Sequence, residues 1–318
     1  MIAGAEATPS AGVAARATTD ARTDTPVELI RALAALTDTP ENAPAGLSVL
    51  LGFGVASSRT EHTQLFVFEL PPYASIYLGE DGWIGGQARE IIAGFWRAVG
   101  RKPPREPDHL AVLLGLYAEL VQEEAGGEAH ARMARQARRA LIAEHLSPWL
   151  FPYLDAVAAA SDSPVHRAWA ATLGDVIAAE MRELSVEGGG SELDGTGASI
   201  HLRLTRPVEA ANQEFLRSVL APIRSGAILT RRDFRLFARE SGLGLRAGER
   251  CYMLRNLLAQ ERTAVLNWLR DHHMRAAEGH EVRGKTGSAA GAAAELARRA
   301  RHTARTLRDL ARQRDGSA

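Results

Sequence analysis

Three short runs in the sequence place an acid or a second histidine next to a histidine. Asp108–His109 and Glu144–His145 each pair a carboxylate with an imidazole, and His272–His273 is a double histidine. Such groups could transfer protons or bind a metal ion within a helical bundle, as in a metal-dependent hydrolase. Hydrolases of the HD type need His followed by Asp, whereas this chain has the reverse order and lacks the usual ligand spacings. The hydrolase is therefore the alternative hypothesis, and we expect no catalytic residue, no bound metal and no cofactor.

Other signatures of catalysis are missing from the sequence or stand in the wrong context. There is no P-loop, no nucleophile elbow and no HExxH motif. Gly242–Arg250 has spaced glycines, but it follows a helical pattern, whereas a dinucleotide-binding turn follows a strand. The single cysteine, Cys251, lies in an amphipathic segment and is expected to be a small buried hydrophobic residue. Because one cysteine can form no internal disulfide, a reducing compartment fits the chain.

The charges of the chain balance. Its 318 residues include 38 Lys and Arg against 38 Asp and Glu, so the net charge is zero with neutral histidines. A protein that binds a polyanion along its whole length needs a basic face, and we expect no specific nucleic-acid partner. The Arg-rich segment Arg298–Arg314 leaves a nucleic-acid-associated regulator as a third hypothesis, with weak and non-specific binding.

Hydropathy argues against insertion into a membrane. No run of about 18 apolar residues without a charge occurs, which excludes a membrane span. Charged residues interrupt the Ala- and Thr-rich residues 1–25, which therefore lack the apolar core of a secretory signal. We expect a cytoplasmic protein.

The helical period of the apolar residues predicts an all-α fold. By composition, the chain divides into a flexible tail, a helical domain, a Gly-rich linker, a helical C-terminal extension and a basic Ala/Arg-rich tail, at residues 1–25, 26–184, 185–200, 201–280 and 281–318. Thr230 and Asp233 have the spacing of a capping box at the start of one helix of the extension. Residues 281–318 carry nine Lys and Arg against four Asp and Glu, and we expect their helix to lack the apolar surface for firm packing.

Four segments of the helical domain carry specific predictions. Leu47–Ala56 is apolar nearly all round and predicts a central core helix, and Leu110–Val121 has one apolar stripe and predicts the best-formed helix. His62–Leu70 is expected to be a helix that ends before two prolines. Pro71–Gly86 predicts a loop, because prolines enter it and four glycines loosen it. Loops with several large rings fold back onto a core or present a surface to a partner, and this one carries Tyr73, Tyr77 and Trp83.

Three motifs follow one another in the helical domain. The first, Pro71–Leu78, is a proline- and aromatic-containing loop with a small-x-Tyr element, and the second, Glu106–Leu110, is an acidic-Pro-acidic-His helix start. The third, His145–Trp149, is a His-Leu-x-Pro-Trp helix end. In this order the motifs resemble the redox-enzyme maturation chaperones of the TorD/DmsD/NarJ type. The resemblance covers residues 26–184 and implies a helical bundle of the TorD-like type.

The resemblance implies a non-enzymatic function. Such chaperones bind the apo form of a molybdopterin oxidoreductase, commonly at its twin-arginine signal peptide, and hold it back from export until the cofactor is inserted. The residues that the resemblance assigns to client binding are Tyr73, Ser75, Tyr77, Glu106, Pro107, Asp108 and His109. The residues that match the third motif, with an architectural role as the alternative, are Glu144, His145, Pro148 and Trp149. A homodimer is also open, because helical segments can exchange between protomers.

The chemistry of such a client suits the second motif. A twin-arginine signal presents guanidinium groups and then an apolar run, so its receptor needs carboxylates beside an apolar or aromatic groove. Asp108, at a helix start near the Tyr73 and Tyr77 rings, could offer both, and His109 adds a group that titrates near neutral pH. Arg231–Arg232 is an internal arginine pair without a signal-like apolar run behind it, so the chain is not itself such a client. The role of residues 198–318 stays open.

Overall fold

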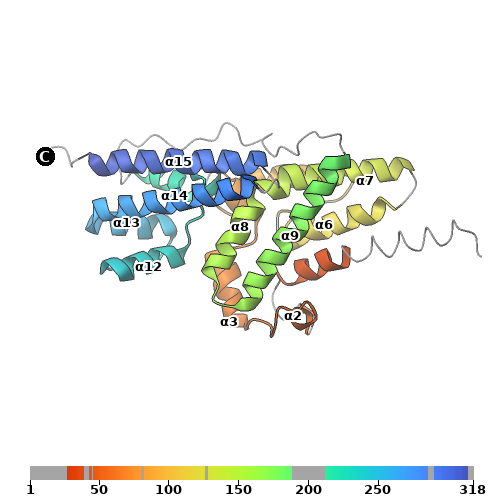
Figure 1. The fold of residues 1–318 in the computed structure, drawn as a ribbon, viewed down its shortest axis with the longest axis horizontal. Coiled ribbons are helices and arrows are strands. Elements are labelled where there is room, and N and C mark those ends of the chain that lie inside the picture. The colour runs from red at the N-terminus through yellow and green to blue at the C-terminus, as the bar shows by residue number, and fades with distance from the viewer. Residues whose placement is uncertain are drawn as a thin grey trace, which may run out of the picture.

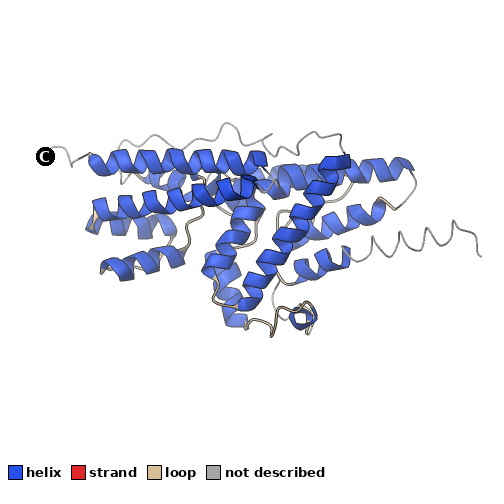
Figure 2. Ribbon diagram, in the orientation of Figure 1, coloured by secondary structure: helices blue, strands red, loops and turns tan. Residues whose placement is uncertain are grey.

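The computed structural model describes residues 27–38, 43–44, 46–79, 82–125, 128–187, 212–285 and 290–313. These residues are mainly helical and contain no strand beyond one isolated bridge, which confirms the predicted all-α fold (Figure 2). The expected tail at residues 1–25 and most of the expected Gly-rich linker lie outside them. Among these residues, no helix combines the length and the apolar character that a bilayer crossing requires.

The described residues between 27 and 187 form what we call the N-terminal bundle. Residues 27–35 are helical. The elements that follow are α2 (Leu47–Leu50), α3 (Arg59–His62), the π-helix η1 (Thr63–Glu69), α4 (Ala74–Leu78), α5 (Gly86–Ala98), α6 (Leu110–Glu123), α7 (Glu128–Ala140), the π-helix η2 (Leu141–Leu146), α8 (Ser147–Ala160) and α9 (Pro164–Glu187). The predicted apolar stripe of α6 is buried along its length, and α8 packs beside α9 (Figure 1).

The described residues between 212 and 313 form what we call the C-terminal extension. Its helices are α10 (Gln213–Leu220), α11 (Pro222–Ser225), α12 (Arg231–Ser241), α13 (Arg250–Gln260), α14 (Arg262–Lys285) and α15 (Ala290–Arg312). Their large apolar side chains form a second buried cluster, distinct from that of the N-terminal bundle. Thr230 and Asp233 form the predicted capping box, and Cys251 is buried as predicted.

Helices α14 and α15 lie side by side over most of their length (Figure 1). The expectation that the helix in residues 281–318 lacks the apolar surface for firm packing is wrong for α15. Its buried apolar side chains are Ala292, Ala293, Leu296, Ala297, Ala300, Ala304, Leu307 and Leu310. Five of these eight side chains are alanines, which let the neighbouring backbone approach closely. The length of the helix therefore supplies the contact that large side chains would otherwise provide.

The turn after α11 is held by both long helices. Gly226 has a φ of 78°, and its carbonyl oxygen accepts a hydrogen bond of 2.9 Å from the ring of His280. The hydroxyl of Thr303 donates to the carbonyl oxygen of Ser225 at 3.0 Å. A Cβ atom at position 226 would lie 2.4 Å from the backbone nitrogen of Ala300. The turn and the backbone of α15 therefore touch where only glycine fits.

The prediction of a central core helix at Leu47–Ala56 is wrong. Only the first residues form a helix, α2, and the side chain of Leu50 is 83% exposed. Gly52 and Gly54 adopt φ values of 75° and 96°, which an α-helix cannot accommodate. The glycines therefore end the helix after one turn and leave Leu50 and Val55 at the surface.

The segments on either side of Pro71 differ from the predictions in detail. His62–Leu70 is helical as predicted, with the wider π geometry over η1. The prediction of a continuous loop at Pro71–Gly86 is wrong, because α4 forms inside it. Prolines and glycines flank α4, but four of its five residues are buried, and this burial stabilises a short helix that local signals do not reveal.

Several histidines are buried in their neutral form. Burial lowers the pKa of His145 to about 4 and that of His273 to about 3, and burial together with the nearby His62 lowers the pKa of His166 to about 4. These values lie below the ordinary 6.5, so the folded chain binds fewer protons than the unfolded chain in mildly acidic solution. The stability they confer is complete above the unfolded pKa and is lost as the pH falls towards the folded values.

We therefore expect the free energy of unfolding to fall by about 2–5 kcal/mol between about pH 7 and pH 5. Urea titrations at the two pH values measure the difference. His273→Leu removes one buried titrating group and should shrink the difference, whereas His130→Leu, at an exposed position, should leave it unchanged. A free energy of unfolding that stays constant over this range would contradict the account.

Candidate functional site

The structure brings the first two motifs together. Tyr73 and His109 form an isolated antiparallel bridge, and their rings meet edge to face with centroids 4.8 Å apart. The backbone nitrogen of Ala74 donates to the carbonyl oxygen of Asp108 at 2.9 Å, and that of Leu110 donates to the carbonyl oxygen of Pro72 at 2.8 Å. The start of α6 and the start of α4 are thus held in one position by backbone hydrogen bonds.

Asp108 faces inward and is 1% exposed. Its carboxylate accepts a hydrogen bond of 3.3 Å from the backbone nitrogen of Ser75. The hydroxyl of Ser75 in turn accepts one of 3.0 Å from the backbone nitrogen of Gly85. Asp108 therefore fixes Ser75, and Ser75 fixes the segment that carries Trp83 and Ile84. In this arrangement the carboxylate of Asp108 is not open to a client's guanidinium group.

Three predicted site residues reach the surface at this place. Glu106 is exposed and accepts a hydrogen bond of 3.2 Å from the hydroxyl of Tyr73, whose pKa burial and the nearby carboxylate raise to about 12. His109 is half-buried, and its Nδ1 atom accepts from the backbone nitrogen of Ala111 at the start of α6. Burial lowers the pKa of His109, which keeps the ring neutral and able to accept this hydrogen bond. The carbonyl oxygen of Pro107, itself buried, accepts from the indole of Trp96.

Tyr77, which lies in α4, packs against the third motif. The ring of Tyr77 stacks on that of Trp149, with centroids 5.2 Å apart and an interplanar angle of 4°. The indole nitrogen of Trp149 donates to the carbonyl oxygen of His145 at 2.8 Å. His145 and Pro148 are buried as well, while Glu144 is exposed. The third motif thus contributes mainly to the core that supports the first.

A pocket opens between the N-terminal bundle and the C-terminal extension. Charged residues also line it, but we call it the apolar pocket after the exposed hydrophobic side chains of its rim. From the bundle it is lined by Val67, Phe68, Glu69, Leu70, Pro71, Ile76, Tyr77, Gly82, Trp83 and Ile84. From the extension it is lined by Arg217, Leu220, Ile228, Arg231, Glu249, Arg250 and Cys251. Of the residues assigned to client binding, Tyr77 alone is among these described lining residues.

The rim of the apolar pocket has exposed hydrophobic side chains that sequence reasoning did not assign to a site. Val67, Phe68, Trp83 and Ile84 are 55%, 51%, 57% and 60% exposed. Contiguous exposed apolar groups mark binding surfaces in soluble proteins. A signal for two of them is present in the sequence, because the run Leu65–Phe68 has apolar residues on every face of a helix, and one face must then remain outside the core.

Asp108→Ala is expected to lower the free energy of unfolding by about 1–3 kcal/mol, because the backbone nitrogen of Ser75 loses its buried acceptor. Asp108→Asn keeps an acceptor oxygen and should cost less. Glu106→Ala removes an exposed carboxylate and should change stability by no more than about 0.5 kcal/mol. Urea titration of the three variants measures this order, and equal losses for Asp108→Ala and Glu106→Ala would show that Asp108 does not hold the segment.

The acid–histidine runs do not form a metal centre in the described part of the chain, where no group of three or more His, Cys, Asp or Glu side chains could hold a metal ion. The runs lie at the start of α6, in η2 and in α14. His272 and His273 each donate a ring N–H to a backbone carbonyl oxygen, that of Ile228 and that of Leu269. The geometry of these residues therefore lends no support to the alternative of a metal-dependent hydrolase.

Part of the N-terminal bundle is similar to a known protein family. Residues 55–154 match the family model described as nitrate reductase delta subunit. The matched residues contain all three motifs, which confirms the resemblance to maturation chaperones of the TorD/NarJ type. No curated protein matches the chain.

Proposed function

We propose that this chain, whose residues 55–154 carry the pattern of the nitrate reductase delta-subunit family, is a chaperone for the maturation of a molybdopterin oxidoreductase. It binds the apo form of the catalytic subunit at the twin-arginine signal peptide, assists insertion of the cofactor and delays export until insertion is complete. The function requires a cytoplasmic location and no catalytic residue. One observation supports it most strongly: the exposed apolar rim of the pocket lies entirely within the matched residues.

The apolar pocket suits the apolar run of a signal peptide. Burying one large apolar side chain stabilises a complex by about 1.5–3 kcal/mol before the costs of association are subtracted. Val67 and Phe68 come from η1, and Trp83 and Ile84 come from the segment before α5, so the two pairs face a ligand from different elements. Apolar side chains presented in this way can contact a helix or an extended segment without a fixed sequence.

The predicted site residues take two roles in this proposal. Tyr77 forms part of the pocket wall, and Tyr73, Glu106 and His109 form an accessible surface beside it. The buried residues Ser75 and Asp108 are positioning residues, which fix the segment bearing Trp83 before the client binds. The buried Pro107 holds Trp96 of α5 through its carbonyl oxygen. A rim that is ordered in advance loses less conformational entropy on binding, and this increases affinity.

A comparison of binding to the apo client and to the cofactor-loaded client tests the proposal. The purified chain is mixed with the catalytic subunit of a molybdopterin oxidoreductase from the same cells, prepared either from molybdate-starved or from molybdate-fed cultures. We expect the apo subunit to co-purify with the chain and the loaded subunit to be released. Equal capture of both forms, or of neither, would contradict the function.

A further inference from the structure

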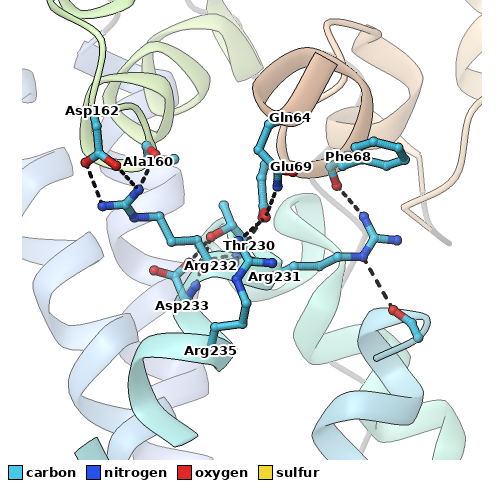
Figure 3. Close-up of polar contacts among 11 residues, drawn as sticks. Gln64, Phe68, Glu69, Ala160, Asp162, Thr230, Arg231, Arg232, Asp233 and Arg235 are labelled. Atoms are coloured by element: carbon cyan, nitrogen blue, oxygen red, sulfur yellow. Dashed lines mark hydrogen bonds and ion pairs between the residues drawn. The ribbon is translucent and has the colours of Figure 1, made fainter. Parts of the chain in front are cut away.

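Helix α12 contacts the N-terminal bundle through two adjacent arginines (Figure 3). The guanidinium group of Arg232 donates to both carboxylate oxygens of Asp162 at 2.9 Å and to the carbonyl oxygen of Ala160 at 3.0 Å. The guanidinium group of Arg231 donates to the carbonyl oxygen of Phe68. An arginine pair of the C-terminal extension is thus bound by acceptors of the bundle.

Glu69 completes this set of acceptors. Its side chain is 4% exposed, and one oxygen accepts from the backbone nitrogen of Arg232 at 2.9 Å. The other oxygen accepts from the guanidinium group of Arg235 at 2.5 Å and from the amide of Gln64 at 3.1 Å. The carboxylate therefore also lies at the N-terminus of α12, where a negative charge is favourable.

Three of the four acceptor residues lie at the ends of helices. Phe68 and Glu69 are the last residues of η1, and Ala160 is the last residue of α8, so their carbonyl groups lie at the negative ends of two helices. We call Phe68, Glu69, Ala160 and Asp162 the arginine dock. Two carboxylates and two carbonyl oxygens favour guanidinium over ammonium groups, because the planar fork of arginine can donate several hydrogen bonds at once.

The contact between α12 and the dock is polar and replaceable. The apolar face of α12 packs elsewhere, with the ring of Phe237 stacked on that of Trp268 at 4.6 Å within the second core. Asp162 is 85% exposed, and an ion pair of that exposure contributes little to stability. Another arginine pair can therefore replace Arg231 and Arg232 without disrupting either core.

The dock also adjoins the apolar pocket. Phe68 and Glu69 belong to both, and Arg231 lines the pocket from the other side. A peptide whose arginine pair occupied the dock would have the exposed rim around Trp83 within reach of the residues that follow. This order of charge and apolar surface complements a segment with two adjacent arginines before an apolar run.

We propose that Arg231 and Arg232 are a built-in occupant of the site that binds the paired arginines of a client, so that α12 competes with the client for the dock. The proposal rests on the chaperone function proposed above. Self-occupation lowers the apparent affinity for the client, because the apparent Kd equals the intrinsic Kd divided by the fraction of molecules in which the dock is open. A segment with paired arginines and an apolar run can displace the side chains of Arg231 and Arg232 from the dock, while a segment with only one of these features competes poorly.

The test uses the full chain and a synthetic peptide with an Arg-Arg pair followed by leucines, and a second peptide with Lys-Lys in place of Arg-Arg. The variant Arg231→Gln/Arg232→Gln frees the dock, and we expect it to bind the Arg-Arg peptide about tenfold more tightly than the parent does. Arg239→Gln/Arg246→Gln removes the same charge at exposed positions and should bind like the parent. Adding Asp162→Asn to the first variant should reduce the gain, and the Lys-Lys peptide should show none.

The inference is overturned if the freed variant binds the Arg-Arg peptide no more tightly than the matched control variant. It is also overturned if both peptides gain equally, because the dock would then not distinguish guanidinium groups. Capture of the apo catalytic subunit separates this failure from a failure of the chaperone function. If the parent and the freed variant capture the subunit equally well, the chaperone function stands but self-occupation of the dock does not. If neither captures the subunit, both proposals are contradicted.

Discussion

Gly226→Ala is expected to lower the free energy of unfolding by about 3–5 kcal/mol, an unusually large loss for the addition of one methyl group. The new Cβ atom would lie 2.4 Å from the backbone nitrogen of Ala300 and 2.5 Å from the carbonyl oxygen of Leu296. Backbone atoms in the middle of α15 cannot rotate away as a side chain can. The turn after α11 and the long helix would have to separate, which would weaken the packing of the C-terminal extension.

Gly242→Ala provides the matched control for this prediction. Gly242 also has a positive φ, 69°, but a Cβ atom there would meet no atom within 4 Å. Its loss should be limited to the strain of a left-handed alanine, about 1 kcal/mol. Thermal and urea unfolding of the two variants, followed by the fluorescence of the tryptophans, measures the difference. Equal losses would mean that close contact with α15 does not determine the role of Gly226.

Phe68→Ala combined with Trp83→Ala is expected to weaken binding of the apo catalytic subunit by about 100-fold or more. The two side chains are 51% and 57% exposed, so their removal should leave the free energy of unfolding nearly unchanged. Calorimetric titration of the subunit into parent and variant measures the affinity, and urea titration checks the fold.

A control of similar chemistry lies on another part of the surface. Leu50 and Val55 are 83% and 85% exposed and line no part of the apolar pocket. Leu50→Ala combined with Val55→Ala removes apolar area at the same low cost in stability, and it should bind the subunit like the parent. A loss of affinity shared by both double variants would indicate non-specific hydrophobic binding and would contradict a role for the pocket.

The sequence predicts much of the fold, because long amphipathic helices depend on a local pattern. The apolar stripe of α6 and the capping box before α12 are both found where expected. The packing of α15 is not predicted, since alanine contributes little to hydropathy and the many arginines dominate the average. The burial of such a helix depends on a neighbour, α14, whose surface the local sequence of α15 does not describe.

The candidate site is predicted only in part. The sequence motifs bring Tyr73, Asp108 and His109 together, but they do not show that the carboxylate of Asp108 faces inward towards Ser75. The rim of the pocket depends on contacts between distant segments. Likewise the arginine pair is visible in the sequence, whereas its acceptor Asp162 lies 70 residues before Arg232. Charge and hydropathy patterns carry no information on such long-range pairs.

Hydrogen–deuterium exchange of the full chain, alone and bound to the apo catalytic subunit, tests the central claim most directly. If the apolar pocket is the binding site, backbone amides at residues 67–69 and 82–84, which line it, exchange more slowly in the complex. Protection confined to other surfaces, with unchanged exchange at these residues, would contradict the account.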